Sequence, residues 1–399
     1  MSSNIITLPT VYNGATIILN RSKSIIIRYL IVYFLYHKTL LPIQEDDSAD
    51  IHIVHHCLSI IQKFTQNTKH PTIINVHDCG TAYRFLMAIL AISEGVWHLT
   101  GSERLLQRPI EPLVQALKSI GADITKIDNG WCIHGKILHA NEITIHCEES
   151  SQFASSLMLI SKKIGLQNIH LVPTQIPSQP YFQLSQFVMN APYQPTPLLN
   201  ESDWSSAAFW YVYLAISKNI TTFTLSHLHL DSPQADRIIA HWMQPFGITS
   251  EQQGDDVIIT KTTVKHVPPQ KWDLYNHPDL APILSVLSVL YPCNATLSNI
   301  QNLDLKESKR ATKLATDLSS FAFIKHFNKY LQIRVNQNYY NLFSPLYLDI
   351  ANDHRLAMAY ILLNLKYPII LKDIDCVKKS YPQFLKYFHI GHDSFQNKT

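Results

Sequence analysis

The sequence predicts an α/β fold of two similar domains, each built from three repeated βαβαββ-type units with buried parallel helices. The chain has 399 residues, more than the ~100 to 200 that one domain commonly holds, so two domains are expected. A pattern of small or polar residues followed by a dense apolar run recurs six times. Amphipathic patterns and β-branched runs separate the copies. Six copies divide naturally into two domains of three.

The six apolar runs are expected to form the buried helices. They read SKSIIIRYLIVYFL (22–35), DCGTAYRFLMAILAI (78–92), SSQFASSLMLI (150–160), DWSSAAFWYVYLAI (203–216), HPDLAPILSVLSVLY (277–291) and NDHRLAMAYILLNL (352–365). They recur about every 65 residues. A helix that is apolar on all sides is typical of a protein interior.

The segments between these runs predict surface helices and strands. The helical segments carry apolar residues near i, i+3, i+4 and i+7, a spacing that gives a helix one apolar face; they are 108–124, 232–248 and 306–321. The β-branched segments predict strands, and they include EITIHC (142–147), DDVIIT (255–260) and YLQIRV (330–335).

The composition argues against several classes of protein. Hydrophobic residues make up 46% and charged residues 16%, which is globular composition and not that of a disordered chain. A formal net charge of +3 is too small to indicate a nucleic-acid or membrane-surface binder. The longest apolar segment, IIIRYLIVYFLY, has twelve residues and contains Arg28, short of the ~20 that span a bilayer.

The cysteines and the start of the chain predict a cytoplasmic protein without a metal site. The six cysteines are scattered with no CxxC pair, and the twenty histidines include no HExxH motif. Reduced thiols are therefore expected. The opening MSSNIITLPTVYNG has no basic region leading into an apolar one, so no secretory signal is predicted.

Several predicted buried helices carry a cation near their first turn, namely Lys23, Arg28, Arg84 and Arg355. A helix begins with a partial positive charge and unpaired N–H groups, so a cation there is unfavourable unless an anion lies beside it. Helix starts that face one site also bind anions well. The pattern favours an anionic ligand, although Arg84 could equally hold the site together.

An ordered set of motifs resembles the 5-enolpyruvylshikimate-3-phosphate synthase family. The matching segments, in that family's order from residue 22 to 384, are SKSIIIR, CGTAYRF, GSERLLQRPIEPLVQALKSIGA, SSQFASSL, SQPY, ESDWSSAA, PDLAP, NLDLKESKR, NDHRLAMA and KKSYPQF. Each motif alone is weak, but the ordered set is specific and covers nearly the whole chain.

The resemblance implies a domain plan. The family folds as two domains of three repeats joined by two chain crossings, which matches the six-fold pattern. By this resemblance residues 22–202 form the first domain, on the shikimate 3-phosphate side. Residues 1–21 and 203–399 form the second, which carries the acid and base carboxylates, with the hinge near 20–22 and 200–204. A monomer is expected.

The resemblance also implies a reaction. Enolpyruvyl transfer from phosphoenolpyruvate to the 5-hydroxyl of shikimate 3-phosphate releases phosphate and needs no metal or organic cofactor. Both substrates are phosphorylated carboxylates, which require several placed cations. Two alternatives stay open: the related UDP-N-acetylglucosamine enolpyruvyl transferase, and an anion-binding scaffold without turnover. The motifs SKS, SSQ and SQPY favour the phosphoshikimate acceptor over a nucleotide sugar.

The resemblance assigns residues to each substrate. The shikimate 3-phosphate side is assigned Lys23, Ser24, Arg28, Ser150, Ser151, Gln152, Ser178, Tyr181, Asp279, Asn302 and Lys306. The phosphoenolpyruvate side is assigned Lys23, Gly80, Arg108, Gln152, Arg310, Arg355 and Lys379.

Two carboxylates are expected to carry the proton transfers. Asp279 resembles the family aspartate near the 5-hydroxyl, and Glu307 resembles the glutamate that exchanges the proton at C3 of phosphoenolpyruvate. Lys23 is expected to stabilise developing charge. Asp279 could instead be a helix cap after Pro278, and Glu307 could be an ion-paired surface carboxylate.

The sequence departs from the family pattern at several points. LNR precedes SKS where the family has Pro-Gly, so Asn20 and Arg21 differ, and Asp78 replaces an asparagine or small residue. The segment between Met189 and Glu201 is short, which predicts that the first domain lacks a hairpin.

Overall fold

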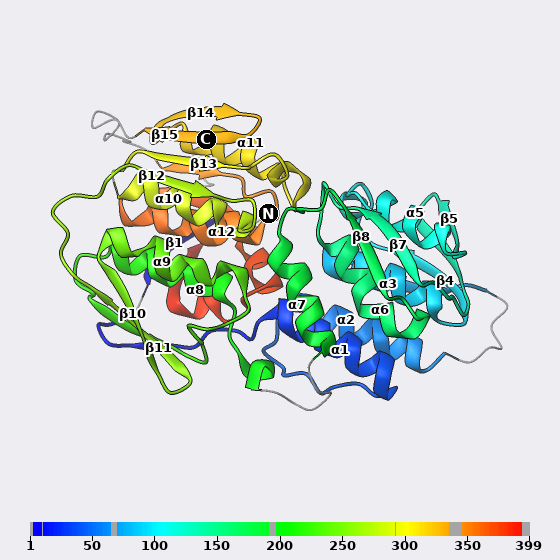
Figure 1. The fold of residues 1–399 in the computed structure, drawn as a ribbon. Coiled ribbons are helices and arrows are strands. Elements are labelled where there is room, and N and C mark those ends of the chain that lie inside the picture. The colour runs from blue at the N-terminus through cyan, green and yellow to red at the C-terminus, as the bar shows by residue number, and fades with distance from the viewer. Residues whose placement is uncertain are drawn as a thin grey trace. The chain divides into compact units, whose positions relative to one another are not determined.

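The computed structural model describes residues 3–9, 11–64, 70–190, 197–291, 293–334 and 345–392. The chain divides into two compact units. The central unit comprises Ser22–Leu199, and the terminal unit comprises Met1–Arg21 together with Asn200–Thr399. Both units combine helices with mixed sheets, which confirms the predicted α/β class (Figure 1).

Three buried helices form the core of the central unit. They are α1 (Lys23–His37), α3 (Gly80–Ile92) and α6 (Gln152–Ile164), and α6 packs against both of the others. Each begins where its apolar run begins. The shorter or more exposed helices around them are α2 (Ala49–Gln62), α4 (Glu103–Leu106), α5 (Glu111–Ser119) and α7 (Gln179–Asn190).

The sheets of the central unit are unequal. A four-stranded sheet has the order β3 (Thr72–Asn75), β4 (Gly95–Thr100), β6 (Gly130–Gly135) and β5 (Asp123–Ile127). The strands β7 (Glu142–His146) and β8 (Asn168–Val172) form a parallel pair.

The three repeats of the central unit differ from one another in their described residues. Within its described residues, only α3 has a four-stranded sheet, while the α6 repeat contributes the β7–β8 pair. The short segment after Met189 leaves little chain for a further hairpin, and its residues 191–196 lie outside the described part.

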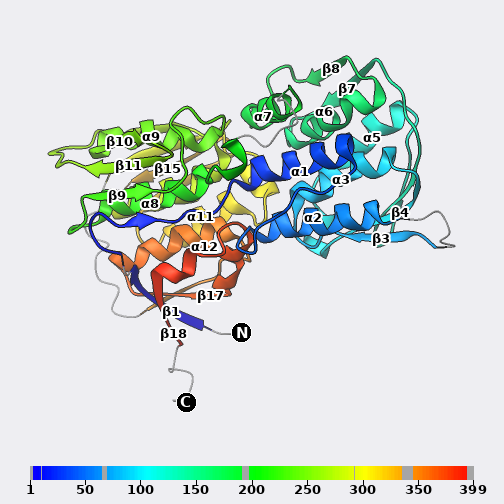
Figure 2. The same ribbon diagram turned by 90° about the horizontal axis from the view of Figure 1, so that it is seen from below.

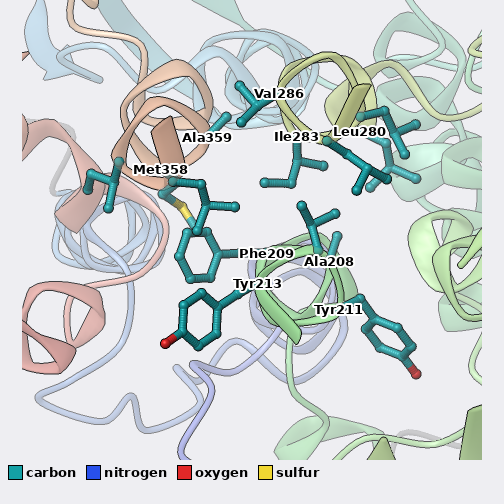
Figure 3. Packing of buried hydrophobic residues seen from close by; sticks show 14 of the residues in the cluster. Ala208, Phe209, Tyr211, Tyr213, Leu280, Ile283, Val286, Met358 and Ala359 are labelled. Carbon is teal, nitrogen blue, oxygen red and sulfur yellow. The ribbon is translucent and has the colours of Figure 1, made fainter. Parts of the chain in front are cut away.

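The terminal unit repeats the plan more regularly. Its buried helices are α8 (Trp204–Ile216), α10 (Ala281–Leu290) and α12 (His354–Ile361), and α10 packs against both of the others. Figure 3 shows Phe209, Ile283 and Met358 meeting between the three helices. Large apolar side chains on all sides of α8 suit this fully enclosed position.

Three four-stranded sheets surround this core, one for each helix of the predicted pattern. The first has the order β16 (Leu346–Leu348), β17 (Ile369–Lys372), β1 (Ser3–Pro9) and β18 (Phe388–His392). The second has the order β10 (Ile248–Gln253), β11 (Asp256–Lys261), β9 (Thr222–Leu225) and β2 (Thr16–Ile17). The third has the order β12 (Gln270–Asp273), β13 (Ala295–Ser298), β15 (Tyr330–Arg334) and β14 (Phe323–Phe327). The helices α9 (Ile239–Trp242) and α11 (Arg310–Leu318) complete the unit.

The first 21 residues belong to the terminal unit through several contacts. The strand β1 lies beside β18, which brings the two ends of the described chain together (Figure 2). Tyr381 Oη donates a hydrogen bond of 2.6 Å to the Ile18 carbonyl. Arg21 and Ser202, close to the two chain crossings, form an antiparallel bridge.

No helix in the described part of the chain is both long and apolar enough to span a bilayer.

Candidate active site

A buried arginine, Arg310, supports the start of the buried helix α12 in the terminal unit. Asp353 caps α12 by accepting hydrogen bonds from the backbone N–H groups of Arg355 and Leu356 at 3.0 and 3.4 Å. Its carboxylate also accepts hydrogen bonds from Nε and Nη2 of Arg310 at 3.0 and 3.2 Å. The buried guanidinium therefore supports the cap of one helix from the first turn of α11.

Arg310 also binds the two carboxylates that the sequence assigned to proton transfer. Its Nη1 lies 3.0 Å from Asp279 Oδ1, and its Nη2 lies 2.9 Å from Glu307 Oε2. The Arg310 side chain is 1% exposed, whereas Asp279 and Glu307 are 24% and 19% exposed. The carboxylates thus have an accessible edge, while the cation that fixes them is enclosed.

Two further cations approach Asp279. Arg355 Nη2 lies 3.5 Å from Asp279 Oδ2, and Lys306 Nζ lies 3.9 Å from Oδ1. Arg355 Nη2 also lies 4.0 Å from Asp203 Oδ2, the carboxylate that caps α8. Because Asp203, Asp279 and Asp353 stand at the starts of α8, α10 and α12, these contacts bring the three helix starts together.

The surrounding charges determine the protonation of this cluster. Burial alone would raise the pKa of Asp279, but Lys306, Arg355 and Arg310 outweigh it and hold that pKa well below its ordinary value. Burial would lower the pKa of Arg310, yet its three carboxylate partners raise it above the ordinary value. Both groups are therefore charged at neutral pH.

The remaining assigned residues of the terminal unit lie on short turns. Asn302 directly precedes the 3₁₀ turn Leu303–Leu305, which leads to Lys306. Lys379 ends the 3₁₀ helix Ile374–Lys379. Both residues are partly exposed.

In the central unit, Lys23 pairs with an acidic residue that sequence reasoning did not identify. Lys23 Nζ lies 2.9 Å from Asp50 Oδ2, and the two side chains are 16% and 5% exposed. Asp50 lies in the first turn of α2, where a carboxylate favours the positive helix end. The sequence offered one signal for this partner, an acidic residue close to the start of a helix.

Arg28 is enclosed between α1 and α7. It donates hydrogen bonds to Ser185 Oγ at 2.8 Å, to the Ser24 carbonyl at 2.7 Å and to the Tyr181 carbonyl at 2.9 Å. Burial lowers the pKa of Arg28 to about 10, so it keeps its charge at neutral pH. These three acceptors carry no formal charge, and the Arg28 side chain is buried.

Gln152 connects the starts of α3 and α6. Its Oε1 accepts a hydrogen bond from Arg84 Nη1 at 2.8 Å, and its Nε2 donates to Thr81 Oγ1 at 3.1 Å. Its backbone N–H donates to Ser150 Oγ at 3.2 Å, and Ser151 stands at the N-cap position. Arg84 further donates to the Pro109 carbonyl at 3.1 Å, so it holds neighbouring elements together.

Gly80 lies against Arg108. A Cβ added at Gly80 would be 2.6 Å from Arg108 Nη1 and 3.1 Å from Arg84 Nη1. A side chain at Gly80 would therefore force the Arg108 guanidinium to move from its position at the first turn of α3.

Ser178 and Tyr181 lie at the start of α7. Ser178 has a φ of 57°, a left-handed conformation that few non-glycine residues adopt. Its carbonyl accepts a hydrogen bond from the Tyr181 N–H at 3.1 Å. Arg28 Nη2 donates a hydrogen bond to the Tyr181 carbonyl, so Tyr181 lies beside Arg28.

The structure corrects the argument from cations at helix starts. An external anion was expected because Lys23, Arg28, Arg84 and Arg355 stand near positive helix ends, where a cation is unfavourable without an anion beside it. Each has a partner within the protein, and for Lys23 and Arg355 that partner is a carboxylate. Their positions therefore do not by themselves require a ligand.

Within the ranges that the structure describes, no group of three or more His, Cys, Asp or Glu side chains is arranged to hold a metal ion. The six cysteines are free, and burial raises the pKa of Cys57 to about 12.

Replacing Asp353 with alanine should destabilise the terminal unit by about 3 to 5 kcal/mol, because it removes a helix cap and leaves Arg310 short of a buried partner. The matched control is Asp375→Ala, whose side chain is 75% exposed in a pair with Lys378 and should cost at most about 1 kcal/mol. Urea unfolding measures both. Equal losses in the two variants would contradict the structural role of the Arg310 cluster.

Comparisons with known proteins agree on one family. The model of the family EPSP synthase (3-phosphoshikimate 1-carboxyvinyltransferase) matches residues 40–192 and 194–388. The chain is 30% identical over 397 residues to the 3-phosphoshikimate 1-carboxyvinyltransferase of Bacteroides fragilis, covering 93% of each protein. It is 29% identical over 333 residues to that of Pyrococcus abyssi, covering 79% of this chain and 78% of the relative. A solved EPSP synthase from Acinetobacter baumannii has the same fold, with a TM-score of 0.66, 17% identity and coverage of 98% of this chain and 99% of that one. The chain belongs to the EPSP synthase family.

Proposed function

We propose that this protein transfers the enolpyruvyl group of phosphoenolpyruvate to the 5-hydroxyl of shikimate 3-phosphate and releases phosphate. The observation that carries this proposal is the pair Asp279 and Glu307 held on one buried arginine, Arg310, in a chain of this family. The pair offers two separately placed carboxylates, which suit a reaction with proton transfers at two atoms. The proposal includes a cytoplasmic monomer that uses no metal or organic cofactor.

We propose that the two parts of the chain divide the substrates. The segment 22–202 carries the shikimate 3-phosphate side, and residues 1–21 with 203–399 carry the acid and base carboxylates, with the hinge near 20–22 and 200–204. The charges support this division. The cation Arg28 bonds to neutral oxygen atoms, whereas Arg310 is surrounded by carboxylates. The first arrangement suits an anionic substrate, and the second suits proton transfer.

Shikimate 3-phosphate is expected to use hydroxyl and cationic groups near the starts of α1, α6 and α7. Its phosphate is assigned to Ser150, Ser151, Ser178 and Lys23, where helix N–H groups add favourable dipoles. Its carboxylate is assigned to Ser24 and Arg28. The remaining assigned contacts are Gln152, Tyr181, Asp279, Asn302 and Lys306.

Phosphoenolpyruvate brings a phosphate and a carboxylate, and its assigned groups are mainly cations. They are Lys23, Gly80, Arg108, Gln152, Arg310, Arg355 and Lys379. Gly80 contributes space, because a side chain there would displace Arg108. Arg310 acts chiefly by fixing Asp279 and Glu307, since its own side chain is 1% exposed.

The chemistry begins when the 5-hydroxyl attacks C2 of phosphoenolpyruvate and C3 gains a proton. Asp279 takes the proton of the attacking 5-hydroxyl, and Glu307 in its protonated form supplies the proton to C3. Glu307 then takes a proton back from C3 as the bond between C2 and the phosphate oxygen breaks, and the proton held by Asp279 leaves with the phosphate. Lys23 stabilises negative charge that develops on oxygen. The substrate carboxylate draws Arg355 away from Asp279, which raises the low pKa of Asp279 and makes it a stronger base.

The first experiment measures phosphate release from phosphoenolpyruvate with each possible acceptor. Release is expected with shikimate 3-phosphate and not with UDP-N-acetylglucosamine. Release with the nucleotide sugar alone would favour the related transferase. Binding of both substrates without release would favour the anion-binding scaffold.

Glu307→Gln should lower turnover by ~10²- to 10⁴-fold, because glutamine keeps the hydrogen-bonding shape but cannot transfer a proton. Incorporation of solvent deuterium at C3 should slow in parallel. The control is Glu251→Gln, an exposed position on β10 of the same unit, which should keep normal turnover. Near-normal turnover of Glu307→Gln would reduce Glu307 to an ion-pair partner of Arg310.

Gly80→Ala should raise the KM for phosphoenolpyruvate by about ten-fold or more, equivalent to one weakened charged hydrogen bond. The reason is the 2.6 Å approach of the new Cβ to Arg108 Nη1. The same substitution in an Arg108→Ala background should have a smaller effect, since the obstructed group is absent. Equal effects in both backgrounds, measured by steady-state kinetics, would refute this link between Gly80 and Arg108.

A further inference from the structure

A third buried carboxyl lies beside the cluster of Asp279 and Arg355 and has no part in the proposed chemistry. Asp236 belongs to the 3₁₀ turn Ala235–Ile238, which packs against α8, and it is 1% exposed. Ser205 Oγ lies 2.5 Å from its Oδ2. Its Oδ1 has no hydrogen-bond partner among the described residues. A buried carboxylate with one hydroxyl donor is poorly compensated.

The charged and titratable groups around Asp236 come from each neighbouring element. Asp203 at the start of α8 and Asp279 before α10 contribute negative charge, and Arg355 of α12 contributes positive charge. His277 Nδ1 lies 3.9 Å from Asp236 Oδ1, too far for a hydrogen bond. Burial lowers the pKa of His277, so this histidine is mostly neutral at pH 7. The charge of Arg355 therefore acts on Asp203, Asp236 and Asp279, and Asp279 has Arg310 and Lys306 as further partners.

These surroundings favour the protonated form of Asp236. Burial and the nearby charge of Asp279 raise its pKa to about 7, although Ser205 and Arg355 oppose the shift. Asp279 itself stays ionised, because Lys306, Arg355 and Arg310 all act on it. Of these two carboxyls, Asp236 is the one that keeps a proton near neutral pH.

We propose that Asp236 is a positioning residue, which must carry its proton for Arg355 and Asp279 to be arranged for phosphoenolpyruvate. This inference rests on the proposed function, since it adds a residue to the same site. When Asp236 is neutral, Arg355 is shared by Asp279, Asp203 and the incoming carboxylate. When Asp236 loses its proton to solvent, the new negative charge attracts Arg355 and lowers the positive potential that an anionic substrate meets. Affinity for phosphoenolpyruvate then falls as pH rises.

Asp236→Asn tests this, because asparagine is neutral at every pH and can still accept the Ser205 hydrogen bond. In the wild type, the KM for phosphoenolpyruvate should rise by about ten-fold between pH 6 and 8.5, the effect expected of one nearby charge. In Asp236→Asn this rise should be largely absent. Ionisation of the substrate phosphate is common to both proteins and cancels in the comparison. The matched control Asp231→Asn, an exposed position in the same segment, should keep the wild-type profile.

Ser205→Ala provides a second variant with a predicted direction. Loss of this hydroxyl removes a group that favours ionised Asp236, so the rise in KM should move to higher pH. A shift to lower pH, or parallel profiles for the wild type and Asp236→Asn, would overturn the proposal.

Thermal unfolding without substrate provides a readout that does not depend on the reaction. A carboxyl whose folded pKa is raised stabilises the fold fully below its unfolded pKa of about 3.9 and loses this contribution as pH rises through about 7. The wild type should therefore lose stability relative to Asp236→Asn over that interval. A constant difference in Tm would overturn the inference.

Calorimetric binding of phosphoenolpyruvate alone separates this inference from the proposed function. If phosphate release fails with shikimate 3-phosphate but binding still weakens with pH in the wild type and not in Asp236→Asn, the proposed function fails and the role of Asp236 stands. If release occurs and the two binding profiles are parallel, the proposed function stands and the role of Asp236 fails.

Discussion

The organisation of the terminal unit depends on the buried guanidinium of Arg310. It binds Asp353, Asp279 and Glu307, which come from three separate segments of the chain. Buried charges are costly unless they are paired, so this arginine and its carboxylates must be assembled together. The same contacts support the cap of α12 and hold the two candidate catalytic carboxylates in position. Fold and chemistry therefore share one set of interactions.

The central unit also holds cations at the starts of its buried helices, and their partners there include neutral oxygen atoms. Lys23 pairs with Asp50, but Arg28 is held by carbonyl and hydroxyl oxygen atoms. Neutral acceptors fix the geometry of a guanidinium without cancelling its charge. This difference supports the proposal that the central unit carries the shikimate 3-phosphate side and the terminal unit carries the acid and base carboxylates.

Arg355 connects binding to catalysis in the proposed mechanism. It lies near Asp279 and Asp203, and Asp236 is close enough to affect the same balance of charge. A substrate carboxylate that competes for Arg355 changes the basicity of Asp279. In this mechanism the bound ligand changes the charge around Asp279, and no further side chain needs to contact Asp279.

The sequence by itself determined the α/β class and the starts of the six buried helices, because long apolar runs have stable positions only in an interior. Its ordered motifs also indicated the family. It did not reveal that Lys23 and Arg355 have carboxylate partners. Arg310 and Asp353 are 43 residues apart, and Lys23 and Asp50 are 27 apart. Only the tertiary structure decided these pairings and the burial of Asp236, since a side chain's charge partners and its exposure to water depend on which distant segments pack around it.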